Sequence, residues 1–131
     1  MDEHLKQSEK FSVVKRGKSF TYAGRGIWLF LKTTHNAWIH SVILIIAVVA
    51  GIYFGITSTD WMLLTLAAGL VLAAEAFNTA IEIDINLTSP EYHPYARDTK
   101  DVAAGAVLIA AITAAIIGVF IFGPYILGFL I

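Results

Sequence analysis

The chain has 131 residues, of which 57% are hydrophobic, and it carries a formal net charge of −1 with no cysteine. A mean hydropathy of +0.72 is far above that of an ordinary soluble domain, so the composition indicates a small integral membrane protein of one domain. The lack of cysteine excludes disulfide frameworks and thiolate metal sites, and no feature of the charge pattern indicates a nucleic-acid partner.

The N-terminal third precedes the first apolar span. Residues 1–10 are predicted to be a flexible N-terminus, and residues from about 11 to 35 are predicted to form an amphipathic helix on the membrane surface. Its apolar residues recur at helical spacing: Phe20, Ala23, Gly24, Ile27, Phe30 and Leu31. The basic residues Lys18, Arg25 and Lys32 lie elsewhere around the helix. A simple basic anchor for the first span is the alternative interpretation.

Three apolar stretches are long enough to cross a bilayer, which takes about 20 apolar residues. They cover about residues 37–56, 61–87 and 102–122. The third is expected to stop at Gly123 and Pro124, so that the apolar tail 123–131 lies along or just beyond the interface. Small residues such as Ala67 and Ala103 would let the second and third helices approach closely.

The basic residues orient these spans. All 9 Lys and Arg side chains precede the first span or lie between the second and third. The connection at residues 57–60 has none. Because cytoplasmic segments carry the excess of basic residues, the N-terminus and the loop at residues 88–101 are predicted to be cytoplasmic.

The second span carries a polar stripe near its cytoplasmic end. At 100° per residue, the following side chains share one face: Glu75, Asn78, Thr79, Glu82 and Asn86. Asn and Thr are typical of polar contacts that hold membrane helices together. Two carboxylates at membrane depth favour a functional site instead.

The residues around this stripe suggest phosphoryl transfer. One carboxylate can take a proton from an alcohol, and another can hold Mg²⁺ together with phosphate oxygens. Glu91, Tyr92 and His93 lie between two prolines, and Lys100 and Asp101 are expected to start the third helix, with Lys100 on phosphate and Asp101 as cap. A proton or ion pathway would use similar residues on the stripe.

Three stretches carry a family resemblance. They are EAFNTAIE at residues 75–82, SPEYHP at 89–94 and KDVAAGAVL at 100–108. Together they resemble the signature of the prokaryotic diacylglycerol kinase family, which includes undecaprenol kinases. The resemblance implies an all-α integral membrane fold with one surface helix and three transmembrane helices over residues 11–131. It also implies a homotrimeric bundle in the bacterial inner membrane, with active sites shared between protomers, that uses ATP and Mg²⁺ to phosphorylate a membrane lipid alcohol.

The same resemblance assigns roles to individual positions. Glu75 would be the general base, Glu82 would hold Mg²⁺ on the ATP phosphates, and Asn78 would lie beside them. The residues that would bind nucleotide are Lys15, Tyr22, Glu91, Tyr92, His93, Lys100 and Asp101. His40 would be either a contact at the membrane edge or an anchor for the first span.

Some positions depart from the family pattern. Thr34 replaces a glutamate that usually binds metal, Trp38 replaces an arginine, and Asn86 replaces an aspartate. Because the loss of the two carboxylates weakens Mg²⁺ binding, the alternative is a catalytically degenerate member that binds nucleotide or lipid or serves in assembly. The EYHP and AAGAVL stretches favour undecaprenol over diacylglycerol as substrate. A channel is the weakest hypothesis, because it has no use for those elements.

Overall fold

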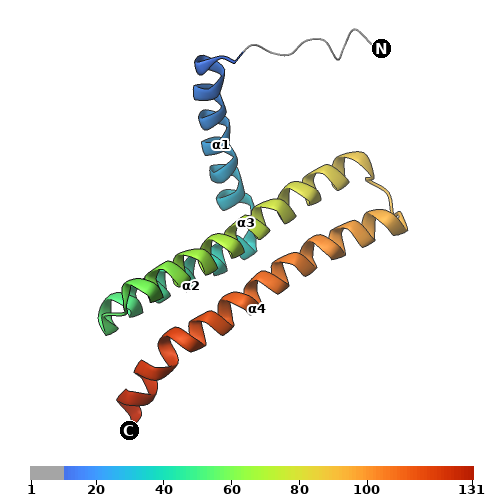
Figure 1. The fold of residues 1–131 in the computed structure, drawn as a ribbon. Helices are drawn as coiled ribbons and strands as arrows, with labels where there is room; N and C mark the ends of the chain where they lie inside the picture. Colours follow the sequence, from blue (N-terminus) through green and yellow to red (C-terminus); the bar gives the residue numbers. More distant parts are fainter. Residues whose placement is uncertain (1–10) are drawn as a thin grey trace.

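The structure is a computed structural model that describes residues 11–131 (Figure 1). The helices in this range are α1 (Val13–Thr33), α2 (His35–Phe54), α3 (Ser58–Thr88) and α4 (Pro94–Leu130). Helices α3 and α4 form an antiparallel hairpin, α2 runs beside α3, and α1 projects away from the other three (Figure 1). The prediction of a flexible N-terminus concerns residues 1–10, which lie outside the described residues.

The boundary between the surface helix and the first span lies at Thr34. This residue has extended backbone angles, φ −105° and ψ 115°, which interrupt the helical hydrogen bonding between α1 and α2. Helix α2 ends at Gly55, whose φ of 63° lies in the left-handed region that glycine adopts without strain. The chain therefore has a helix at each of these two predicted places, with α2 beginning at His35 rather than Ala37. The location of α1 on the membrane surface stays a prediction.

Helix α3 begins earlier than predicted, at Ser58 rather than Trp61. The Thr57 hydroxyl accepts a hydrogen bond from the Asp60 backbone N–H, and the Asp60 carboxylate accepts one from the Thr57 backbone N–H. This capping box satisfies donors that have no partner within the helix. Most of the connection expected at residues 57–60 is therefore the first turn of α3.

Helix α4 differs from the predictions for the preceding loop, for its N-cap and for its C-terminal end. It begins at Pro94, so most of the loop expected at residues 88–101 is helical, and its N-cap is His93 rather than Asp101. The His93 Nδ1 accepts a hydrogen bond from the Tyr95 backbone N–H, and proline suits the first helical position. Polar residues mark where a helix leaves the membrane, not where it ends.

The predicted stop at Gly123 and Pro124 is also wrong, because α4 continues to Leu130 with Pro124 inside it. Proline removes one backbone donor and commonly bends a helix, yet membrane helices tolerate it where neighbouring groups compensate. The residues expected to form an interfacial tail are thus the last turns of α4.

The three helices α2, α3 and α4 are each long and apolar enough to cross a membrane. The predicted all-α integral membrane fold is confirmed. At 1.5 Å per residue, α3 and α4 are about 46 and 55 Å long, whereas the hydrocarbon core is about 30 Å thick. Both helices are therefore longer than the hydrocarbon core that they would cross. The homotrimer stays a prediction.

The packed core of the described chain lies at the far end of the bundle, away from the hairpin tip. Ile56, Leu64 and Ile121 are buried there. The rings of Phe54 and Tyr125 stack with their centroids 5.5 Å apart. Since Tyr125 follows Pro124, this contact depends on the continuation of α4. Nearer the tip, Ala67, Ala103 and Ala110 are buried, as expected for close helix approach.

Candidate active site

Glu75 is the largest fully buried side chain in the described residues. It belongs to a seam of α3 residues that recur every three or four positions and are all buried: Leu64, Ala67, Val71, Glu75 and Asn78. Within residues 11–131, neither carboxylate oxygen of Glu75 nor the Oδ1 of Asn78 accepts a hydrogen bond. Buried acceptors without donors are unfavourable, so this group of oxygens is typical of a site that receives a donor or a cation.

His40 on α2 faces this carboxylate. Its Nε2 lies 3.0 Å from the Glu75 Oε1, a distance suited to an ion pair although the ring N–H is not aligned for a hydrogen bond. The interpretation of His40 as an anchor or a membrane-edge contact did not include this contact. The signal in the sequence was weak, because the pairing depends on how α2 is placed against α3.

A polar pocket of about 430 Å³ opens beside Glu75, where α1, α2 and α3 meet. Its polar lining consists of Thr33, Thr34, His35, Asn36, Asn78, Thr79, Glu82 and Asn86. The hydroxyls of Thr34 and Thr79 are 3.0 Å apart, and the Asn78 Nδ2 lies 3.5 Å from the Glu82 Oε1. Four residues of the polar stripe predicted on the second span form one wall of this pocket, namely Asn78, Thr79, Glu82 and Asn86, whereas Glu75 does not line it.

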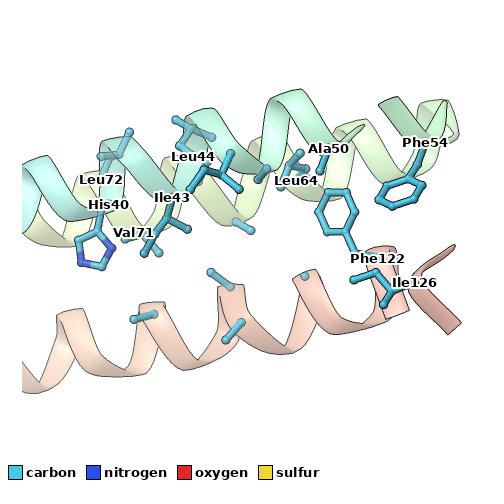
Figure 2. Close-up of a pocket in the computed structure, with 18 residues that line it drawn as sticks. His40, Ile43, Leu44, Ala50, Phe54, Leu64, Val71, Leu72, Phe122 and Ile126 are labelled. Carbon is cyan, nitrogen blue, oxygen red and sulfur yellow. The ribbon is translucent and has the colours of Figure 1, made fainter. Parts of the chain in front are cut away.

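An apolar pocket of about 470 Å³ lies on the other side of His40, between α2, α3 and α4. Figure 2 shows His40 at one end of this pocket and Phe54, Phe122 and Ile126 at the other. Its walls between these ends are aliphatic side chains and small residues of the three helices. His40 thus lines the apolar pocket while contacting the carboxylate that lies next to the polar one.

Lys100 reaches the polar pocket from α4. Its Nζ donates a hydrogen bond of 2.6 Å to the Oδ1 of Asn86, which lines the pocket. This bond joins α3 to α4 near the tip of their hairpin and places a cation at the pocket edge. Lys100 therefore lies beside the polar stripe in this chain, and its role in nucleotide binding stays a prediction.

The EYH segment has local structural partners. His93 caps α4, and the Tyr92 hydroxyl accepts a hydrogen bond of 3.2 Å from the Arg97 guanidinium. The backbone oxygen of Glu91 accepts a hydrogen bond from the Ser89 hydroxyl at 3.4 Å. These contacts shape the connection between α3 and α4, and none of the three side chains lines either pocket.

Three other predicted nucleotide contacts lie apart from the polar pocket in this chain. Lys15 and Tyr22 are exposed on α1, and the residues of α1 that line the pocket are Leu29 and Thr33, near its end. Asp101 is exposed in the second turn of α4. A single chain thus places Asn78 and Glu82 in the polar pocket, with Glu75 one turn from Asn78 and Lys100 on Asn86, but it does not place these three there.

The oxygen atoms of the polar pocket suit Mg²⁺, which prefers hard oxygen ligands and usually keeps several waters and substrate phosphates. Glu82 supplies the carboxylate, and the buried Asn78 Oδ1 is an acceptor without a partner in residues 11–131. In the same residues, no group of three or more His, Asp or Glu side chains could hold a metal. The use of Mg²⁺ and ATP in this pocket stays a prediction.

Comparisons with known proteins agree with this geometry. The profile of the prokaryotic diacylglycerol kinase family matches residues 21–122. The undecaprenol kinase of Bacillus subtilis (strain 168) is 38% identical over 107 residues, covering 82% of this chain and 87% of the relative. The diacylglycerol kinase of Synechocystis sp. is 38% identical over 101 residues, covering 76% of this chain and 58% of the relative. The diacylglycerol kinase of Escherichia coli (strain K12) is 33% identical over 92 residues, covering 65% of this chain and 75% of the relative. The region that matches the family profile contains the polar pocket and all of the apolar pocket except Ile126, whereas Lys15 lies before it.

Proposed function

This chain belongs to the prokaryotic diacylglycerol kinase family and is an ATP-dependent lipid kinase, and we propose that it phosphorylates undecaprenol with Glu75 as general base. The proposal rests on the position of Glu75 in the structure. Its buried carboxylate contacts His40 of the apolar pocket and lies one turn from Asn78 of the polar pocket. A lipid hydroxyl and an ATP phosphate can meet only where an apolar and a polar site adjoin.

The chemical step needs one proton acceptor. The lipid oxygen attacks the γ-phosphorus, an oxygen–phosphorus bond forms, and the bond from that phosphorus to the β–γ bridging oxygen breaks to release ADP. The hydroxyl proton passes to Glu75. This carboxylate suits the role because both of its oxygens are buried and accept no hydrogen bond from residues 11–131.

The polar pocket would receive the nucleotide. Glu82 would hold Mg²⁺, which supplies a positive charge that screens the phosphate oxygens. Asn78 contacts Glu82 and presents a free acceptor to the same space. Lys100 would turn from Asn86 to a phosphate oxygen, because a charged acceptor makes a stronger hydrogen bond than a neutral amide.

The apolar pocket would receive the lipid chain. The pocket extends along α2 from His40 to Phe54, about 21 Å at 1.5 Å per residue. That length suits a single long hydrocarbon chain with its hydroxyl at the His40 end. An apolar groove discriminates weakly between lipids, so diacylglycerol would be a poorer substrate rather than an excluded one.

The active unit would be a homotrimer in the bacterial inner membrane, with the polar pocket on the cytoplasmic side. The basic residues before α2 and after α3 support this orientation. Helix α1 projects away from the bundle (Figure 1), so its Lys15 and Tyr22 would reach the polar pocket of a neighbouring protomer. Active sites shared in this way would explain why one chain leaves these two side chains apart from its own pocket.

A catalytically degenerate protein is not favoured over a kinase. Thr34 and Asn86 are neutral, which motivated that alternative. However, the relatives described above are named as kinases, and this chain retains both Glu75 and Glu82. Thr34 also has a partner in the Thr79 hydroxyl, which keeps the pocket wall hydrogen-bonded without a carboxylate.

The test is transfer of labelled γ-phosphate from ATP to undecaprenol and to diacylglycerol in mixed micelles. Glu75→Gln should lower the kcat by at least about 100-fold, the scale of general-base catalysis, while the protein stays folded. Asp84→Asn is the matched control, because Asp84 is an exposed carboxylate of the same helix outside both pockets, and its kcat should not change. A Glu75→Gln enzyme that keeps most of its activity would exclude Glu75 as the base, and faster transfer to diacylglycerol would reverse the lipid preference.

A further inference from the structure

His40 stands between the buried carboxylate of Glu75 and the apolar pocket (Figure 2). It lies in the second turn of α2, and its side chain is 21% exposed, whereas that of Glu75 is 0% exposed. We propose that His40 is a positioning residue that holds Oε1 of Glu75, so that Oε2 takes the proton of the lipid alcohol. This inference rests on the proposed role of Glu75 as the base.

The contact has an electrostatic reason. An ionised carboxylate within a membrane protein is unfavourable unless a partner lies close to it. His40 is the ion-pair partner that the structure gives Glu75 among residues 11–131, with 3.0 Å between Nε2 and Oε1. It is therefore the side chain placed to hold that carboxylate in one orientation.

The geometry needs one small adjustment. The ring N–H of His40 is not aligned on Oε1, since neither Glu75 oxygen accepts a hydrogen bond from the described residues. Rotation about the Cβ–Cγ bond of a histidine is only weakly restricted, so a turn of the imidazole would align Nε2–H on Oε1. The carboxylate would then be held by one oxygen and would present the other.

The location of His40 favours this role over anchoring of the span. An anchor would be an exposed side chain, as the nearby Trp38 is, with 70% of its surface exposed. His40 instead turns toward α3 and lines the apolar pocket, which is otherwise built from hydrocarbon side chains and small residues. It is thus the polar side chain that an alcohol at this end of the pocket would meet beside Glu75.

The test compares two amides at this position. In His40→Gln the side-chain nitrogen is as many bonds from Cβ as the histidine Nε2, so the donor can still reach Oε1. In His40→Asn the donor is one carbon–carbon bond shorter, about 1.5 Å, and falls out of hydrogen-bond range. Both variants keep a polar, uncharged side chain, so they should fold alike. Ser41→Ala is the control on the same helix, because the Ser41 hydroxyl bonds only to the Ala37 carbonyl of its own helix in the described structure.

We expect His40→Asn to lower the kcat by about 10- to 100-fold with an unchanged KM for ATP, as a misplaced catalytic group does. His40→Gln should retain most of the wild-type kcat, and Ser41→Ala all of it. Thermal unfolding in detergent should be the same for the two amides. Equal kcat values for Gln and Asn would overturn the inference, and so would a loss that appears in KM or follows the melting temperature.

Glu75→Gln, measured alongside, separates this inference from the proposed function. If it is inactive while His40→Asn is normal, the positioning role fails and the base survives. If Glu75→Gln is active, the base assignment fails and the role of His40 fails with it.

Discussion

Thr34→Glu tests whether a single carboxylate limits the metal site. Thr34 lies at the junction of α1 and α2, and its hydroxyl is 3.0 Å from that of Thr79 across the polar pocket wall. Glu82 and Asn78 line the same pocket. A glutamate at position 34 would add a second carboxylate to the oxygens that face a Mg²⁺–ATP complex.

The expected change in Mg²⁺ affinity follows from the attraction between the new carboxylate and the ion. Two unit charges 4 Å apart in water interact by about 1 kcal/mol, so a carboxylate and a divalent ion gain about 2 kcal/mol. That energy corresponds to about 30-fold tighter binding. Repulsion between the new carboxylate and Glu82 without the ion would act in the same direction. The Mg²⁺ concentration that gives half the maximal rate should therefore fall by about 10- to 30-fold.

The assay is phosphate transfer at saturating ATP and lipid over a Mg²⁺ titration. Thr34→Gln is the matched control, because it has the shape of glutamate without the charge and also loses the bond to Thr79. Its half-maximal Mg²⁺ concentration should stay at or above the wild-type value. If the Glu and Gln variants titrate alike, the second carboxylate does not reach the ion, and the site is completed in another way.

Three further outcomes test the packing, the phosphate contact and the assembly. Gly51→Ala should destabilise the protein by about 1–3 kcal/mol in thermal unfolding, because its Cβ would lie 2.8 Å from the Trp61 Cη2. Gly69→Ala, whose Cβ meets nothing within 4 Å, should not destabilise it. Lys100→Met should raise the KM for ATP by about 10- to 100-fold, which corresponds to the loss of one hydrogen bond to a charged group. Arg97→Met is the control and should leave the KM for ATP unchanged. Equal KM values would remove Lys100 from the nucleotide site. Crosslinking in mild detergent should give a ladder that ends at three copies, and a monomer throughout would contradict shared sites.

Features that depend on local composition and helical period could be predicted from the sequence. Apolar length predicts the three spans, because crossing a bilayer is a property of each segment alone. The period of an α-helix likewise places Asn78, Thr79, Glu82 and Asn86 on one face, and these four line the polar pocket. The seven-residue spacing of Glu75 and Glu82 also belongs to a single helix.

Helix ends were predicted less well, because composition marks where a helix leaves the membrane and not where its hydrogen bonds stop. His93 caps α4 well before its apolar run begins, and the helix then continues through Pro124. The residues after that proline were expected to be a tail. They are held in the helix, where Tyr125 stacks on Phe54 of α2.

Hydropathy, helical period and short motifs are properties of a single stretch of chain, so they identify a membrane protein whose second span carries a polar stripe with kinase motifs. The contacts between helices are visible only in the folded structure: His40 with Glu75, Thr34 with Thr79, and Lys100 with Asn86. Each of these pairs joins residues far apart in the sequence. Their contact depends on the rotation and depth of one packed helix against another, and no local pattern encodes either quantity.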